Sequence, residues 1–154
     1  MPDFDTIIVG YGPTGKLLAK FLADAGHKVA VVERWQGTYS LPRAIAFFHD
    51  AARMFRALGL WDRIAPTVRP FDQYTWYDKD WGVLINFDHG EESPSGGPGG
   101  FTFSQPDLET VFDEDLAIHP GVTLIKGHDA IEIGQSESGA YVRIAPYSSE
   151  TQSA

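Results

Sequence analysis

The chain of 154 residues contains no cysteine, and it has few basic residues. The first absence excludes disulfides, thiolate metal sites and cysteine nucleophiles. Against 12 lysines and arginines stand 21 aspartates and glutamates, which gives a formal net charge of −9. Since an acidic surface repels the phosphates of nucleic acids, we expect no nucleic-acid partner.

Long apolar runs are also lacking. No run approaches the roughly 20 residues that a membrane-spanning helix requires. The N-terminal stretch MPDFDTIIVG carries acidic residues where a secretion signal needs basic ones. The five histidines show no ligand spacing, so no metal site is expected. With 43% hydrophobic residues, the chain is expected to be globular. Since it has neither a long apolar run nor a basic leader nor a cysteine, we expect a soluble, cytoplasmic protein without a membrane partner.

The first part of the sequence has the pattern of a βαβ unit. Residues 5–10 (DTIIVG) form a short β-branched run that is typical of a buried parallel strand. Residues 13–25 have apolar side chains at helical spacing, and Gly26 follows them. Residues 27–33 (HKVAVVE) form a second apolar run. Strand, helix and strand together predict a right-handed crossover.

The turn between the first strand and the helix reads GYGPTG, which places Gly10, Gly12 and Gly15 in the pattern G-x-G-x-x-G. Gly10 permits a tight turn, Gly12 lets a pyrophosphate approach the backbone, and Gly15 lets the helix pack closely on the strand. The helix begins at Pro13 and Thr14, and its N-terminus offers free N–H groups and a partial positive charge to phosphates. The motif therefore predicts a site for the ADP half of a dinucleotide.

The acidic residue at the end of the second strand supports this prediction. Glu33 lies 23 residues after Gly10, close to the usual spacing of about 20. A carboxylate at this position accepts hydrogen bonds from ribose hydroxyls and repels a 2′-phosphate, which disfavours NADP at this site. The alternative is a structural glycine turn with a surface glutamate, but strand, spacing and acid agree on a nucleotide site.

The remainder of the sequence departs from the pattern of an NAD dehydrogenase. Such an enzyme usually continues with another helix and parallel strand, whereas this chain reaches its third buried strand only at 122–126. This layout is typical of FAD proteins of the glutathione-reductase type. The expected fold class is α/β, an incomplete Rossmann FAD-binding domain with an antiparallel β excursion. Its further elements are a helix at 44–58, antiparallel strands within 72–88, a short strand at 101–104, a helix at 106–118, and a hairpin of 130–133 and 140–145.

Several segments together carry a family resemblance. IIVGYGPTGKLLAKFLADAGHKVAVVER is followed by LPRA, by a helix ending in ALGL, and by SQPDLE before another helix. This order resembles the N-terminal third of class A flavoprotein aromatic hydroxylases, especially the 3-(3-hydroxyphenyl)propionate hydroxylase type. The resemblance implies bound FAD, NAD(P)H as reductant, O2, and a phenolic substrate. Alternatives are a polyketide-tailoring oxygenase, a halogenase, or a non-catalytic nucleotide-binding fragment.

The resemblance also assigns site residues by position. Arg43 of LPRA matches an arginine along the FAD pyrophosphate, and Gln105 matches a glutamine near the ribityl chain and phosphates. Arg34 matches a position near the adenosine or the entering nicotinamide cofactor, and Ala130 matches backbone that touches adenine. Both arginines are alternatively solvated charges, and Gln105 alternatively only precedes a helix start. No residue is assigned a catalytic role.

Two later motifs of the family, D-G and G-D, are missing from this sequence. The chain is therefore expected to be one piece of a longer enzyme, inactive alone, whose remainder is a missing segment or a separate chain. We expect the strand at 6–9 to present an open edge. The expected organisation is a nucleotide-binding lobe (1–70 and 104–127), strands leading into a substrate-domain sheet (71–103), a hairpin or meander (128–147) and a tail (148–154).

Overall fold

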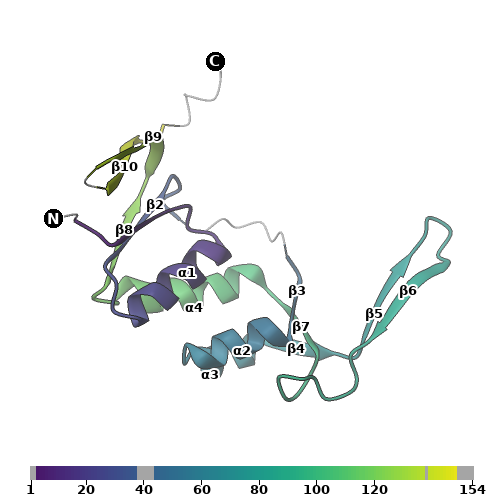
Figure 1. Ribbon diagram of the computed structural model, residues 1–154. Coiled ribbons are helices and arrows are strands. Elements are labelled where there is room, and N and C mark those ends of the chain that lie inside the picture. The colour runs from purple at the N-terminus through teal and green to yellow at the C-terminus, as the bar shows by residue number, and fades with distance from the viewer. Residues whose placement is uncertain (1–2, 38–43, 138, 149–154) are drawn as a thin grey trace. The chain divides into compact units, whose positions relative to one another are not determined.

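The computed structural model describes residues 3–37, 44–137 and 139–148 (Figure 1). The chain divides into two compact units. Unit 1 comprises Met1–Ser40 and Phe112–Ala154, and unit 2 comprises Leu41–Val111. The lobe boundaries expected from the sequence stay a prediction. Within the described residues, no helix is long and apolar enough to span a membrane.

Unit 1 is built on a parallel three-stranded sheet in the order β1-β2-β8. These strands are Thr6–Val9, Val29–Glu33 and Val122–Lys126. The central strand β2 pairs from Val29 with Val122 on one side and with Thr6 on the other, and its first four residues are buried. The connecting helix α1 spans Pro13–Asp24. The sequence prediction of a βαβ unit with a third parallel strand at 122–126 is confirmed.

A hairpin follows the sheet in unit 1. Strands β9 (His128–Ser136) and β10 (Gly139–Pro146) pair antiparallel, with a register shift between Arg143 and Ile144. The predicted hairpin is therefore confirmed, with longer strands than expected. A cavity of about 590 Å³ is lined by side chains of the sheet and of the hairpin, among them Ile7, Val32, Ile125, Tyr141 and Ile144.

Unit 2 has a small antiparallel sheet in the order β3-β7-β4. The strands are Ala46–Phe48, Gly100–Phe103 and Val68–Phe71, and the helical segments are α2 (His49–Ala57), α3 (Trp61–Ile64) and the short 3-10 turn η1 (Ala65–Thr67). The half-buried Phe47 packs against three other aromatic rings, with ring centroids 5.2 Å from Phe55, 5.4 Å from Phe101 and 5.3 Å from Phe103.

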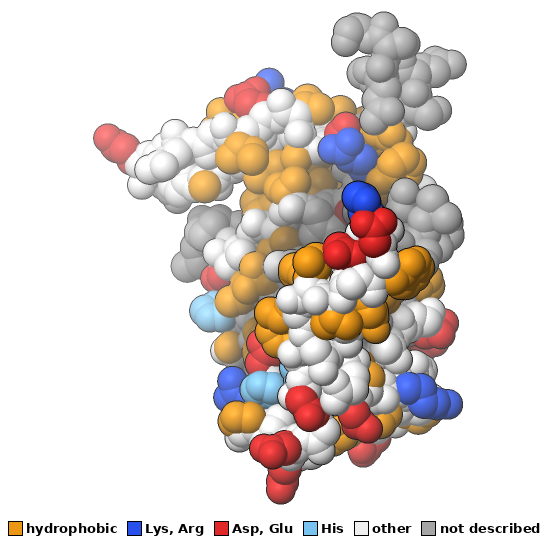
Figure 2. Space-filling model, turned by 90° about the vertical axis from the view of Figure 1, so that its right-hand side faces the viewer, with side chains coloured by type: hydrophobic (Ala, Val, Ile, Leu, Met, Phe, Trp, Pro, Cys, Tyr) orange, Lys and Arg blue, Asp and Glu red, His pale blue; other side chains and the backbone are white. Residues whose placement is uncertain are grey.

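A second hairpin in unit 2 consists of β5 (Gln73–Tyr77) and β6 (Val83–Asp88), which pair antiparallel as predicted. The strands carry many exposed apolar side chains, including Trp76 and Leu84. Apolar side chains interspersed with acidic ones also lie at the surface in the view of Figure 2. Helix α4 (Gln105–Ala117) begins in unit 2 and ends in unit 1, and it matches the predicted helix within one residue at each end.

The predicted helix at 44–58 is wrong in its first part. Residues Ala46–Phe48 form strand β3, and the helix α2 begins only at His49. The physical reason is tertiary pairing, because Ala46 lies opposite Thr102 and Phe48 opposite Gly100 in the antiparallel ladder. Strand β4 was also not predicted, because it contains Pro70, and proline is rare inside strands. Such a residue is tolerated at the edge of a sheet, where β4 lies.

Candidate nucleotide-binding site

The glycine turn has the geometry that the motif predicts. Gly10 adopts a φ of 104°, which is strained for residues with a side chain, and its N–H donates to the carbonyl of Val32 at 2.8 Å. A Cβ on Gly15 would overlap the carbonyl oxygen of Gly10, so only glycine lets α1 approach the turn this closely. By contrast, a Cβ on Gly12 would meet nothing within 4 Å, and the space beside this backbone is open.

The N-terminus of α1 is prepared for an anion. Gly12 is its N-cap residue, with no side-chain hydrogen bond to the helix, and the first turn contains no acidic residue. Pro13 takes the first position, where a missing N–H costs nothing. The amides of Thr14 and Gly15 belong to the first turn, which lacks intrahelical acceptors. These free donors and the helix dipole favour a bound phosphate.

Glu33 is held at the end of β2 by backbone amides. Its Oε2 accepts from the N–H of Tyr11 at 2.8 Å, and its Oε1 accepts from the N–H of Trp35 at 3.0 Å. The carboxylate thus connects the glycine turn to the strand end. Because each carboxylate oxygen has a second lone pair, both remain able to accept from ribose hydroxyls.

A pocket of about 220 Å³ brings four of the predicted residues together in unit 1. Gly10, Glu33, Arg34 and Ala130 line it, with Val9, Val32, His128 and Asp129. Arg34 forms an ion pair with Asp129, whose Oδ1 is 3.3 Å from its Nη2. Sequence reasoning missed His128 and Asp129. Their place just after the buried strand at 122–126 was the available signal, since ligands bind at the carboxyl ends of parallel strands.

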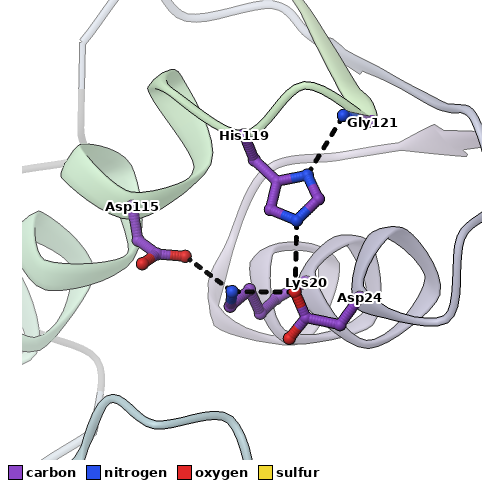
Figure 3. A network of polar contacts seen from close by, with 5 residues as sticks. All are labelled: Lys20, Asp24, Asp115, His119 and Gly121. Atoms are coloured by element: carbon purple, nitrogen blue, oxygen red, sulfur yellow. Dashed lines mark hydrogen bonds and ion pairs between the residues drawn. The ribbon is translucent and has the colours of Figure 1, made fainter.

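A polar network within unit 1 secures α1, the helix that carries the glycine turn (Figure 3). Lys20 Nζ lies 2.9 Å from Asp24 Oδ1 and 3.1 Å from Asp115 Oδ2. His119 Nε2 lies 3.1 Å from Asp24 Oδ1, and its Nδ1 accepts from the N–H of Gly121 at 3.1 Å. Since Nδ1 accepts, Nε2 carries the proton and donates to Asp24. The network therefore ties α1 to the end of α4 and to the loop before β8.

The charge of Lys20 is stabilised by this arrangement. Burial alone lowers the pKa of its ammonium, but hydrogen bonds and Coulomb attraction from Asp24 and Asp115 outweigh burial and raise the pKa above 10.5. Another lysine of α1, Lys16, is 1% exposed, with its Nζ 3.0 Å from Asp113 Oδ1 and 4.7 Å from the ring centre of Tyr11. Neither lysine was predicted, because each interrupts the apolar pattern of the helix.

The last two predicted residues are Gln105 and Arg43. Gln105, in unit 2, is 3% exposed; its Oε1 accepts from the N–H of Ala44 at 3.0 Å and its Nε2 donates to Glu109 at 2.7 Å. Its side chain therefore fixes the backbone directly after Arg43. Arg43 itself lies outside the described residues, and the predicted roles of both residues stay predictions.

The residues present in unit 1 fit a dinucleotide. The open space beside Gly12, the uncapped first turn of α1 and the pocket beside Glu33 have the chemistry that a phosphate and an adjoining ribose require. Among the residues that the structure describes, no group of three or more histidine, aspartate or glutamate side chains is placed to hold a metal ion.

Comparison with known proteins identifies a family of FAD-binding domains and several related hydroxylases. Residues 3–153 match a family described as FAD binding domain. A probable NADH-specific resorcinol 4-hydroxylase from Rhodococcus jostii (strain RHA1) is 35% identical over 86% of this chain and 25% of its own length. A 3-(3-hydroxy-phenyl)propionate/3-hydroxycinnamic acid hydroxylase from Mycobacterium sp. (strain JLS) is 30% identical over 92% of this chain and 25% of its own length.

The fold of this chain is also similar to that of a solved flavin-dependent monooxygenase. The flavin-dependent monooxygenase PieE, in complex with FAD and substrate, superimposes with a TM-score of 0.75 and 26% identity. The match covers 94% of this chain and 27% of PieE. The chain thus spans about a quarter of the length of these relatives.

Proposed function

Because this chain belongs to the FAD binding domain family, we propose that it is the FAD-binding part of an NAD(P)H-dependent flavin monooxygenase that hydroxylates a phenolic ring. The observation that carries the proposal is the glycine turn, where open space beside Gly12 adjoins the uncapped start of α1 and the pocket at Glu33. The parallel sheet followed by a β hairpin supports a Rossmann domain of the glutathione-reductase type.

The predicted residues have distinct tasks in this proposal. The turn from Gly10 to Gly15 holds the pyrophosphate through backbone amides, and Glu33 accepts from the ribose hydroxyls. Arg34 and Ala130 border the adenosine, while Arg43 and Gln105 serve the pyrophosphate and ribityl region. When bound, FAD supplies the redox chemistry between NAD(P)H, O2 and the substrate, and the chain supplies binding and orientation.

The choice of a phenolic substrate rests on the relatives. One is described as an NADH-specific resorcinol 4-hydroxylase and the other as a hydroxylase of 3-(3-hydroxy-phenyl)propionate. Both names describe the hydroxylation of a phenol ring. The remainder of the enzyme, as a further segment or a separate chain, is the proposed partner. The cytoplasm, where NAD(P)H is available and cysteine-free folding needs no oxidation, is the proposed location.

The proposal is tested in two steps. The purified chain is first titrated with FAD, with protein fluorescence and the visible absorption spectrum as readouts, and with ADP as competitor. Saturable binding that ADP displaces is expected, and no FAD-dependent change would contradict the cofactor assignment. The protein in its natural context is then assayed for NADH oxidation with resorcinol. Failure to incorporate oxygen from O2 into any phenol would contradict the hydroxylase assignment.

A further inference from the structure

The carboxyl ends of the three parallel strands of unit 1 lie side by side in the order β1-β2-β8. Gly10 directly follows β1, Glu33 is the last residue of β2, and His128 comes two residues after β8. In the proposed function the turn at Gly10 binds the pyrophosphate and Glu33 binds the ribose. The next strand end along the sheet, at His128, is therefore the place left for the base of the nucleotide.

The pocket of about 220 Å³ in unit 1 joins the ends of β2 and β8. Its volume is below the range of about 300–1,000 Å³ that is usual for small-molecule sites, so it suits one part of a larger ligand. Val9, Val32 and Ala130 give it apolar lining, and Val32 is buried. The pocket therefore suits a planar base that continues from a ribose at Glu33.

Four polar side chains line this pocket within the described part of the chain: Glu33, Arg34, His128 and Asp129. Arg34 Nη2 lies 3.3 Å from Asp129 Oδ1, so these two charges compensate each other. Both carboxylate oxygens of Glu33 accept from backbone amides, and this group is the one proposed for the ribose. His128 is the polar side chain of the pocket to which no partner in a ligand has been assigned.

The tautomer of His128 is fixed by the backbone. Its Nδ1 lies 2.9 Å from the carbonyl oxygen of Lys126, and since a carbonyl oxygen only accepts, Nδ1 carries the proton and donates. In the neutral ring Nε2 is then an acceptor, with no other hydrogen bond to the ring among the described residues. Nε2 becomes a donor only if the ring gains a second proton or gives up its bond to Lys126. The side chain therefore selects a ligand group that donates.

We propose that Nε2 of His128 accepts a hydrogen bond from the 6-amino group of adenine and thereby recognises the base. The inference rests on the proposed function, since the base belongs to the ADP half of FAD, and it adds a residue that determines specificity. A 6-keto group, as in hypoxanthine, places an acceptor opposite Nε2, and both acceptors are then left unsatisfied. His128 thus sets a preference for adenine over hypoxanthine nucleotides.

The test compares two nucleotides on the 154-residue chain by isothermal titration at neutral pH. They are ADP and IDP, in which a 6-keto group replaces the 6-amino group. ADP is expected to bind at least about fivefold more tightly than IDP, because one hydrogen bond is replaced by a contact between two acceptors. Equal affinities, or a preference for IDP, would overturn the proposed base recognition, and this comparison needs no variant.

A pair of variants assigns the preference to one side chain. In His128→Gln the amide offers either an acceptor or a donor, so the preference for ADP over IDP is expected to fall to within about twofold. His27→Gln is the matched control, because His27 lies in unit 1 before the start of β2, at the opposite end of the sheet. It is expected to keep the preference of the unsubstituted chain. An unchanged preference in His128→Gln overturns the role of His128, and circular dichroism verifies that both variants are folded.

A third ligand, 2′-deoxyADP, distinguishes contact with the base from contact with the ribose. Because Glu33 is the group proposed for the ribose, loss of the 2′-hydroxyl is expected to weaken binding by the same factor in the unsubstituted chain and in His128→Gln. A smaller loss in His128→Gln would place the ring of His128 at the ribose and overturn the inference.

Failure of the proposed function has a different signature from failure of this inference. A chain that binds FAD and ADP without preferring ADP over IDP overturns the role of His128 alone. A chain that binds neither FAD nor ADP contradicts the assignment of FAD binding, and the inference falls with it. Saturable FAD binding together with a preference for ADP that His128→Gln abolishes is the result that both predict.

Discussion

At the scale of single residues, Glu33 holds the backbone of the glycine turn and is also the residue proposed to bind the ribose. Both of its carboxylate oxygens accept from backbone amides, of Tyr11 in the glycine turn and of Trp35 after the strand. This contact positions the turn before any nucleotide binds. These hydrogen bonds stabilise the turn, and under the proposed function the same carboxylate also contributes to FAD affinity.

The substitution Glu33→Gln separates these contributions in part. Glutamine keeps one acceptor oxygen but replaces the other by a donor, which faces an amide donor of the backbone. We expect the free energy of unfolding to fall by about 1–2 kcal/mol and the FAD affinity to fall about tenfold. Urea unfolding and FAD titration measure the two effects. Glu137→Gln, at the turn between β9 and β10, is the control, and equal losses in both variants would contradict this role for Glu33.

At the scale of elements, the network around Lys20 holds helix α1 in place. Its side chain is 11% exposed and lies between Asp24 and Asp115. In the proposed function the phosphate site lies at the start of this helix, so the position of α1 sets the geometry of that site. Under that proposal the network links the packing of two helices to cofactor binding.

Stability at alkaline pH tests this network. The pKa of Lys20 is raised in the folded chain, so its contribution to stability is fully present below the ordinary value of 10.5 and is lost as pH rises above it. We expect Lys20→Met to lower the free energy of unfolding by about 1–3 kcal/mol at pH 7. The deficit against the unsubstituted chain should shrink as pH rises beyond 10.5.

Denaturant unfolding at several pH values measures the deficit. Lys79→Met is the control, because Lys79 is 87% exposed and its ion pair is with the equally accessible neighbour Asp80, which is 74% exposed. A deficit for Lys20→Met that stays constant from neutral to strongly alkaline pH would show that the lysine acts by packing and not by charge.

Some elements of the structure could be predicted from the sequence and others could not. The glycine turn was predicted from its own spacing and its distance to Glu33, and its backbone geometry agrees with the motif, while its role in binding stays a prediction. Strand β3 depends on Gly100–Phe103, more than 50 residues away, so its helix-like local pattern was misleading. Asp129 belongs to no motif, and only its position shortly after the buried strand β8 could have indicated that it lines the pocket.

At the scale of the whole molecule, an edge of the parallel sheet stands out. Strand β1 pairs only with β2 among the described strands, as the sequence analysis expected, and Ile7 and Val9 are 36% and 51% exposed. Ile7 also lines the cavity of about 590 Å³ beside the β9–β10 hairpin. An unpaired apolar edge is a template for pairing with another strand.

We therefore expect the chain to self-associate as its concentration rises. Ile7→Lys should reduce this association, because a charge on an edge strand opposes further pairing. Ile118→Lys, which changes an 84% exposed side chain outside the strands, is the control. Light scattering across a concentration series measures the effect. Equal association of the two variants would show that the β1 edge is not the contact.

The central claim is that the turn at Gly12 binds the pyrophosphate of FAD. Gly12 has an ordinary backbone conformation (φ −78°, ψ −175°), and a Cβ there meets only open space, so Gly12→Ala should fold with unchanged stability. Gly37→Ala, also in open space, is the matched control. FAD titration of the three chains is the most direct measurement. We predict that Gly12→Ala binds FAD at least about tenfold more weakly, while Gly37→Ala binds it as the unsubstituted chain does. Unchanged FAD affinity in a folded Gly12→Ala chain would contradict the account.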